Sequence, residues 1–297
     1  RISLVEKKPI SDTGLSRILS NYNFFVGKIA DMELQPKDVY EAIGKLQIVN
    51  ITLDRNVDDA QAIFESLNST GKELSESDLI RNYVLMGLEL SEQRYVYEHM
   101  WRPMELLFDY EKQESVMDRF FRDYLTMKTT RIPKIDRVYE GFKAYHLNCE
   151  FSTICELCAD LLTYATYYTN MVFRSSDKAI LKSLYSDIGD LRMEVAFPFL
   201  LKVHNDCEKG VITEDDLIEI IKMCISYVFR RSICSIPTNS LNKTFATLRN
   251  EIKVNDYMNS IKAFFVLRDD YKEFPDDEKF EKAFVSRDIY NMRSRNF

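Results

Sequence analysis

The chain has 297 residues, 45% of them hydrophobic, and it contains eight glycines and seven prolines. Glycine and proline together average about 12% of residues in proteins, so their low content here disfavours a loop-rich sandwich, a barrel or a disordered chain. The 40 basic and 47 acidic residues give a net charge of −7, which excludes a general basic footprint for nucleic acid but leaves a local patch open.

Cysteine content and the start of the chain bear on the cellular compartment. Six cysteines are too few for a dense disulfide framework, so we expect buried, reduced thiols in a cytoplasmic protein. The longest apolar run, from Val195 to Leu201, is far shorter than the ~18–20 residues that span a bilayer, so no membrane partner is expected. The chain begins with Arg1 rather than Met and with no signal-peptide pattern, which suggests a segment of a longer protein.

Two helical stretches near the N-terminus precede a segment of different periodicity. Residues 15–31 and a stretch from Pro36 have helical spacing, and proline suits the first turn of a helix. Residues 46–54, Leu-Gln-Ile-Val-Asn-Ile-Thr-Leu-Asp, are rich in β-branched side chains and lack glycine and proline, which is typical of a strand. A strand needs a partner, so we expect the remnant of a small α/β domain whose other strands lie upstream.

Helical periodicity returns after Asp58. Residues 60–67 place apolar side chains at i, i+3, i+4 and i+7, and the turn Asn68-Ser-Thr-Gly71 ends that helix. Ser75, with Asp78 three residues later, resembles a capping box that begins the next helix.

Beyond Ser91 the pattern is helical throughout. The expected spans are 91–109, 114–128, 134–146, 151–173, 177–188, 191–206, 214–234, 239–252, 257–267 and 276–285, with a kink or break at Pro198 inside one of them. The sequence therefore predicts a mainly α protein, a multi-helix bundle or array, divided near residue 90 into 1–90 and 91–297.

The turn before the helix that begins near Ser75 is the first candidate binding site. A glycine-containing turn that leads into a helix N-terminus offers free backbone N–H groups to an anion. The candidate residues are Asn68, Gly71, Asp78, Arg81 and Asn82. An ordinary, capped connection between two helices explains the same residues, and both interpretations stay open.

Basic residues late in the chain form the second candidate. Arg231 continues an apolar helix face that includes Val228, and an arginine in such a place finds a carboxylate partner or lines a wet interface. Arg230, Lys243 and Arg249 would complete a small basic patch. Compensation of the helix dipole explains the two adjacent arginines equally well.

Catalytic and metal-binding constellations are not found in the sequence. Cys155 and Cys158 form a C-x-x-C on an amphipathic helix, with no second ligand pair at zinc spacing, so core packing is expected. The three histidines, His99, His146 and His204, lie on helices, two of them near C-terminal ends, where a cation is favourable. We therefore predict no catalytic residue, no metal and no cofactor held by this chain alone.

Residues 60–82, Ala-Gln-Ala-Ile-Phe-Glu-Ser-Leu-Asn-Ser-Thr-Gly-Lys-Glu-Leu-Ser-Glu-Ser-Asp-Leu-Ile-Arg-Asn, resemble a pattern of the GmrSD-type restriction proteins. Two weaker segments follow in family order: residues 230–245, with Arg-Arg, Cys, Pro-Thr and Leu-Asn, and residues 274–290, which begin Phe-Pro. The resemblance implies a ParB-like nucleotide-binding N-terminal domain, a helical region and a C-terminal nuclease domain.

Two family motifs are absent from the chain, namely the phosphate-handling Asp-Gly-Gln-Gln-Arg and the nuclease histidine motif. The resemblance thus implies that residues 1–90 are the C-terminal part of the ParB-like domain and that 91–297 are the helical middle. The expected function is a helical body that couples a nucleotide-sensing domain to a DNA-cleaving domain in a bacterial defence protein. The alternative is a helical scaffold or protein-interaction module.

The resemblance also implies what the complete protein would bind. Nucleoside triphosphate, Mg²⁺ and DNA are expected only for the full-length parent, and the remaining domains of that parent are the expected partners. A self-contained enzyme has little support, because no acid, base or nucleophile constellation can be assembled from these residues.

Overall fold

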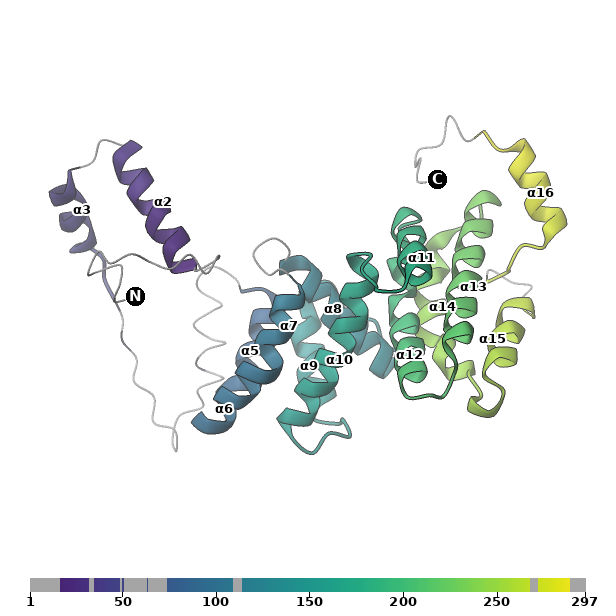
Figure 1. The fold of residues 1–297 in the computed structure, drawn as a ribbon, viewed down its shortest axis with the longest axis horizontal. Coiled ribbons are helices and arrows are strands. Elements are labelled where there is room, and N and C mark those ends of the chain that lie inside the picture. The colour runs from purple at the N-terminus through teal and green to yellow at the C-terminus, as the bar shows by residue number, and fades with distance from the viewer. Residues whose placement is uncertain are drawn as a thin grey trace. The chain divides into compact units, whose positions relative to one another are not determined.

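The computed structural model describes residues 17–31, 35–48, 50, 63, 74–108, 114–267 and 272–288. Of these residues 77% are helical and none lies in a strand, so the predicted mainly α fold is confirmed (Figure 1). Contacts divide the chain into two compact units, Arg1–Asp58 and Asp59–Phe297. The division of sequence domains near residue 90 stays a prediction.

The first unit contains α2 (Arg17–Asp31) and α3 (Pro36–Ile43), and Pro36 lies in the first turn of α3 as expected. The strand predicted over 46–54 is not formed at 46–48 or 50, and the rest of it lies outside the described residues. The side chains of Leu46 and Ile48 are 71% and 89% exposed. An extended segment needs a neighbouring strand to pair its backbone and bury one face, and the described residues provide neither, so no α/β remnant is seen among them.

The second unit is a series of packed helices from α5 to α16. They are α5 (Glu76–Met86), α6 (Leu90–Val96), η1 (Tyr97–Trp101), α7 (Arg102–Leu107), α8 (Glu114–Thr129), η2 (Ile135–Arg137), α9 (Val138–His146), α10 (Ile154–Val172), α11 (Ala179–Asp190), η3 (Glu194–Ala196), α12 (Phe197–Glu208), α13 (Glu214–Ile233), η4 (Thr238–Ser240), α14 (Leu241–Leu248), η5 (Arg249–Glu251), η6 (Val254–Asp256), α15 (Tyr257–Val266) and α16 (Asp277–Ser286). The spans predicted beyond Ser91 agree with these helices to within a few residues at their outer ends. The helix predicted at 60–67 lies outside the described residues except for Ile63, which is helical.

Two prolines interrupt helices that the apolar pattern alone would continue. Proline has no N–H to donate, and before Pro103 the chain forms the π-helical turn η1, in which the Arg102 N–H donates to the Tyr97 carbonyl. The break expected at Pro198 takes a particular form: the 3₁₀ turn η3 ends at Ala196, and Pro198 lies in the first turn of α12. The predicted span 191–206 is therefore divided rather than kinked.

Side-chain caps fix where the longest helices begin. The Thr153 hydroxyl accepts from the Glu156 N–H while the Glu156 carboxylate accepts from the Thr153 N–H, which starts α10. Thr213 and Asp216 form the same reciprocal cap at α13. Each cap contributes about 1 kcal/mol, and both are readable from local sequence.

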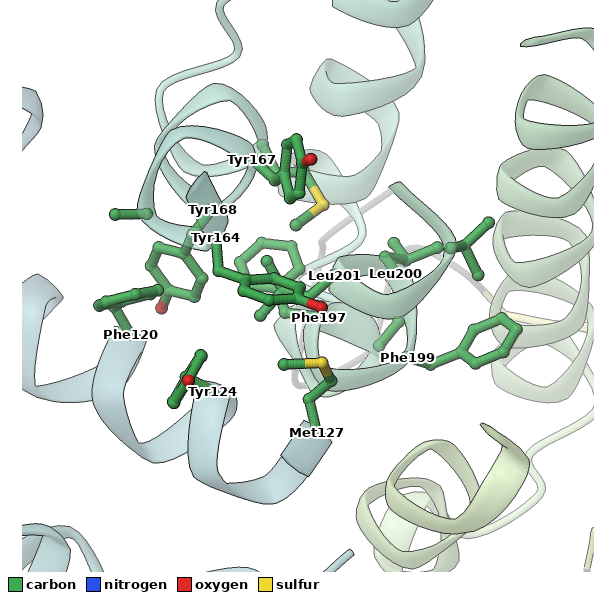
Figure 2. Close-up of a cluster of buried hydrophobic side chains, with 14 of the residues drawn as sticks. Phe120, Tyr124, Met127, Tyr164, Tyr167, Tyr168, Phe197, Phe199, Leu200 and Leu201 are labelled. Atoms are coloured by element: carbon green, nitrogen blue, oxygen red, sulfur yellow. The ribbon is translucent and has the colours of Figure 1, made fainter. Parts of the chain in front are cut away.

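The core of the second unit is rich in aromatic side chains contributed by α8, α10 and α12 (Figure 2). The Phe120 ring centroid lies 5.4 Å from that of Tyr168, which in turn lies 5.3 Å from that of Phe197. These near-perpendicular contacts suit the charge distribution of aromatic rings. Helix α12 contacts α8, α10, α13 and α14, so it connects the earlier helices of this unit to the later ones.

Candidate functional site

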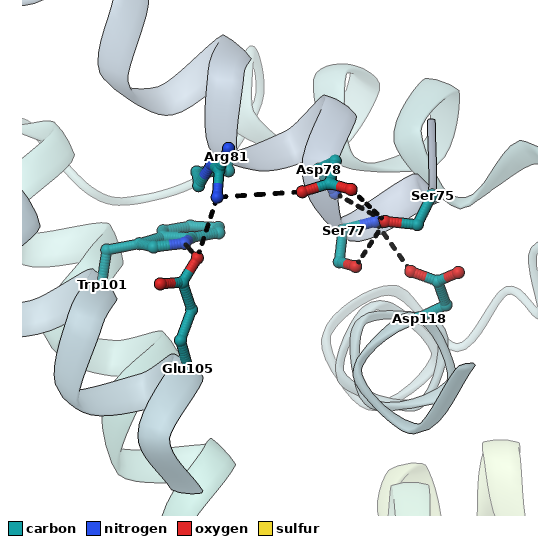
Figure 3. A network of polar contacts seen from close by, with 7 residues as sticks. All are labelled: Ser75, Ser77, Asp78, Arg81, Trp101, Glu105 and Asp118. Carbon is teal, nitrogen blue, oxygen red and sulfur yellow. Dashed lines mark hydrogen bonds and ion pairs between the residues drawn. The ribbon is translucent and has the colours of Figure 1, made fainter. Parts of the chain in front are cut away.

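The N-terminus of α5 is the part of the first candidate site that the structure describes. The Ser75 hydroxyl accepts from the Asp78 N–H at 3.1 Å and donates to the Asp78 carboxylate at 2.9 Å. The expected serine cap is thus present, and the Asp78 carboxylate accepts its hydrogen bond from the Ser75 hydroxyl. The next N–H, that of Ser77, donates to Oδ1 of Asp118 on α8 at 2.8 Å (Figure 3).

Arg81 joins the same helix to α7. Its guanidinium lies 3.2 Å from the Glu105 carboxylate and 3.8 Å from that of Asp78, and the Trp101 indole N–H donates to Glu105 at 3.0 Å (Figure 3). The Trp101 side chain is fully buried. Glu105 therefore contacts both Arg81 and Trp101, and these three side chains link α5 to η1 and α7.

Helix α5 is also part of the hydrophobic core. Ile80 and Val84 are buried, and the Tyr83 hydroxyl lies 2.9 Å from Nδ1 of His146 on α9. The Glu76 carboxylate accepts from the Tyr139 N–H at the start of α9 at 2.5 Å. Burial raises the pKa of Glu76, an effect the backbone N–H groups of Tyr139 and Val138 partly offset. Helix α5 is therefore anchored by apolar and polar contacts together.

These contacts bring two of the five candidate residues together. Asp78 and Arg81 form an ion pair, whereas the half-buried Asn82 side chain makes no hydrogen bond within the described part of the chain. Asn68 and Gly71 lie outside the described residues, so whether they join a site stays a prediction. The sequence did not indicate that Glu105 and Asp118 contact α5, because both residues lie on other helices.

Asp118→Ala is expected to lower the free energy of unfolding by about 2 kcal/mol. It removes a charged acceptor from the N–H of Ser77, whose side chain is 2% exposed, and hydrogen bonds to charged groups contribute about 1.5–3 kcal/mol. Urea unfolding measures the loss. Asp187→Ala, an exposed carboxylate on α11, is the control and should change stability by less than about 0.5 kcal/mol; equal losses would contradict this role of Asp118.

The paired arginines of the second candidate site are held by the segment that precedes α16. Arg231 is 1% exposed and donates to the carbonyls of Glu273 and Pro237, each at 2.9 Å, and to the Ser240 hydroxyl at 3.2 Å. The sequence interpretation expected a carboxylate or a wet interface, whereas the contacts of Arg231 seen here are to backbone carbonyls and a hydroxyl.

Arg230 is more exposed than Arg231. It forms an ion pair with Asp277 at 2.6 Å, donates to the Pro275 carbonyl at 3.1 Å and lies over the Phe280 ring, 4.9 Å from its centroid. Both arginines therefore fasten the 273–277 segment and α16 to the end of α13, which is a structural role.

Lys243 and Arg249 do not join the paired arginines. Lys243 is exposed on α14, and Arg249 donates to the carbonyl of Met127 at the end of α8. Arg249 instead lines a hollow with Lys128, Lys202 and Lys209. Three of these cations, Lys128, Lys209 and Arg249, lie near the C-terminal ends of α8, α12 and α14, where they offset the partial negative charge of the helix ends.

The cysteines and histidines behave as packing residues. Cys155 and Cys158 are free thiols, and burial raises the pKa of Cys158 to about 12. His204 is buried, and burial lowers its pKa to about 4, so the expected favourable cation at a helix C-terminus is wrong for this residue, which is neutral. No cluster of His, Cys, Asp and Glu able to hold a metal ion occurs among the described residues.

A cavity that the sequence did not indicate lies beside α8. It has a volume of about 200 Å³, and its polar lining residues include Arg119, Arg122, Asp123, Tyr168 and Glu194. Asp123 is 9% exposed. In the sequence it is one acidic residue among alternating charges on a helix, and nothing local marks it as buried.

The carboxyl of Asp123 is strongly affected by its surroundings. Burial raises its pKa from 3.8 to about 7, against the opposing effects of the Arg122 and Arg119 guanidinium groups and the Tyr168 hydroxyl, while Glu194 adds to the rise. Near neutral pH the group is therefore divided between its protonated and ionised forms. A titratable side chain of this kind in a cavity is a candidate functional group.

Comparison with known proteins concerns the segment that ends in α5. Residues 4–85 match the family model described as the GmrSD restriction endonuclease, N-terminal domain. This part of the chain, 82 of its 297 residues, is similar to a GmrSD N-terminal domain. The matched segment contains residues 60–82, so the match agrees with the resemblance to GmrSD restriction proteins seen there. No curated protein and no solved structure matches it. None of the described helices is long and apolar enough to cross a bilayer.

Proposed function

We propose that this chain couples a nucleotide-sensing domain to a DNA-cleaving domain through its helical body. The observation that carries the proposal is the place where the family match ends. The match runs to residue 85, inside α5, and α5 belongs to the packed core of the second unit through Ile80 and Val84. The matched segment and the helical body therefore share one helix.

Shared core packing is what makes such a link mechanical. Protein interiors are close-packed, so a helix cannot shift without a rearrangement of the side chains that contact it. Helix α5 contacts α8 and α9, its Arg81 side chain pairs with Glu105 on α7, and its Ser77 backbone N–H donates to Asp118 on α8. A nucleotide-dependent movement of α5 would be transmitted to these three helices.

The ligands of this function come from family resemblance and stay proposals. Nucleoside triphosphate would be sensed by the matched domain, with Asn68, Gly71, Asp78, Arg81 and Asn82 as candidate contacts and the remaining domains of the complete protein as partners. Mg²⁺ would need oxygen ligands, and the described residues hold no suitable cluster, so no step is assigned to it. The six free cysteines support a cytoplasmic location.

The Arg81–Glu105 pair provides the test, since Arg81 belongs to the matched segment and Glu105 does not. In the complete nuclease, Arg81→Gln and Glu105→Gln are each expected to reduce nucleotide-dependent DNA cleavage at least tenfold while leaving nucleotide affinity within about twofold. The double variant should be no worse than either single one, because both remove the same link. The four ribonucleoside triphosphates with Mg²⁺ are the probes, and calorimetry measures their binding.

Lys262→Gln is the matched control, because it breaks an exposed ion pair with Glu219 at 2.8 Å between α15 and α13 and should change nothing. Loss of nucleotide affinity in Arg81→Gln alone would place Arg81 at the nucleotide instead of at the link. Full nucleotide-dependent cleavage in both variants, or no nucleotide dependence in the wild-type protein, would favour the scaffold alternative and refute coupling.

A further inference from the structure

The cavity beside α8 has the construction of a small-molecule site. Its apolar wall is formed by Ile132, Met171, Val172, Val195, Phe197 and Pro198. Few of its polar groups are buried: these are Asp123, Thr126 and Tyr168, while Arg122 is half-buried and Arg119, Glu194 and Asn242 are exposed. Apolar walls with a small number of placed polar groups are the usual lining of ligand pockets.

The Asp123 carboxyl has hydrogen-bonding capacity to spare. The Tyr168 hydroxyl is the side chain that hydrogen-bonds to this carboxyl. An ionised carboxylate has about four acceptor positions, so some of them are available to a ligand. The two nearby arginines are directed in part elsewhere, since Nε of Arg119 donates to the Ser115 carbonyl and Nε of Arg122 to the Pro133 carbonyl. A buried carboxyl that lines a cavity gains from a ligand that supplies further donors.

The volume of the cavity and the charges that line it limit the kind of ligand that it can bind. An apolar cavity of about 150 Å³ accommodates benzene, so the 200 Å³ here suits one ring with small substituents. Arg119 and Arg122 disfavour a cation, Asp123 and Glu194 disfavour an anion, and transfer of a net charge into an apolar cavity is costly. The ligand should therefore be uncharged and should carry N–H groups on an otherwise apolar ring.

We propose that this cavity binds a small uncharged nitrogen heterocycle of one ring, with N–H groups paired to the Asp123 carboxyl and ring faces packed against Phe197 and the aliphatic wall. The site is independent of α5 and of the coupling function, because none of its lining residues belongs to the segment matched by the family.

Two single-ring probes test the proposal on the whole chain. Isocytosine presents adjacent N–H donors suited to a carboxylate, and 2-aminopyrimidine presents a donor and an acceptor suited to a carboxylic acid; both are uncharged between pH 6 and 8. Because the pKa of Asp123 is about 7, isocytosine affinity should rise about tenfold from pH 6 to pH 8 and 2-aminopyrimidine affinity should fall by about as much. Ligand-detected NMR titration over the millimolar range measures the affinities of both probes.

Two variants and two further probes complete the experiment. Asp123→Leu should lose at least tenfold in affinity for isocytosine while still binding benzene, and Asp123→Asn should remove the pH dependence for both heterocycles. If Asp123→Leu does not fold, as judged by circular dichroism, the pH dependence in Asp123→Asn decides alone. The proposal is overturned if neither heterocycle binds, if benzene or inorganic phosphate binds in their place, or if Asp123 variants bind like the wild type.

Discussion

Arg231→Ala is expected to lower the free energy of unfolding by about 3 kcal/mol. The guanidinium is 1% exposed and donates to two carbonyls and one hydroxyl from segments up to 42 residues away. Its removal leaves these acceptors without their donor, at about 1–3 kcal/mol for each buried group. It also opens a cavity next to the Tyr227 ring, whose centroid lies 5.1 Å from the guanidinium carbon.

Arg230 supplies the matched control at the adjacent position. Its ion pair is with Asp277, which is 92% exposed, and pairs of this kind contribute about 0–1 kcal/mol. Arg230→Ala should therefore cost about 1 kcal/mol, including its contact with the Phe280 ring. Urea unfolding of both variants measures the difference.

Two further substitutions at Arg231 separate its contributions. Arg231→Met keeps most of the side-chain volume without donors, so its loss reports on hydrogen bonding, whereas Arg231→Lys keeps the charge without the planar fork. We expect both to be destabilising, with Arg231→Met less so than Arg231→Ala. Small and equal losses in Arg230→Ala and Arg231→Ala would leave only a helix-dipole role for either residue.

Asp123→Asn is expected to change how stability depends on pH. The carboxyl has a pKa of about 7 in the folded protein and 3.8 as its ordinary value, a difference that corresponds to about 4 kcal/mol. Because the folded-state pKa is raised, this contribution is fully present below pH 3.8 and is lost as the pH rises through about 7. Relative to Asp123→Asn, the wild-type protein should therefore lose up to about 4 kcal/mol between pH 4 and pH 8.

The comparison must be made between the two proteins at each pH, because His204 acts in the opposite direction. Burial lowers the pKa of His204 from 6.5 to about 4, so its contribution is present above pH 6.5 and is lost as the pH falls toward 4. The difference between wild type and Asp123→Asn cancels this effect. Urea unfolding at half-unit steps gives the profile, and a difference independent of pH would contradict the assignment of Asp123 as a buried, titrating group.

Helix positions and helix starts could be predicted because the information for them is local. The apolar stripe of α10 and the caps formed by Ser75, Thr153 and Thr213 involve residues three or four positions apart, the spacing that places side chains on one helix face or turn. The mainly α fold and the position of Arg231 at the end of an apolar helix face followed from the same short-range pattern. The similarity to the GmrSD family was also carried by one continuous segment of sequence.

Partners that are far apart in the sequence could not be predicted in this way. The Glu273 carbonyl accepts a hydrogen bond from Arg231, which is 42 residues away in the sequence. The Asp118 carboxylate accepts one from the Ser77 N–H, which is 41 residues away. Neither pairing leaves a local sequence pattern. The strand expected at 46–54 was wrong over its described part for the same reason, since strand formation depends on a pairing partner that β-branched composition alone does not provide.

The sequence by itself determined the helices, the Ser75 cap and the similarity of residues 4–85 to the GmrSD family, because periodicity, capping and a continuous motif act over a few residues. The tertiary structure alone decided which charged groups are buried. Asp123 has the sequence context of an exposed helix residue, and it becomes a buried, titrating group only in the cavity that it lines together with Tyr168, Val195 and Phe197. Burial and its electrostatic cost are properties of the packed helices together, so no single helix carries them.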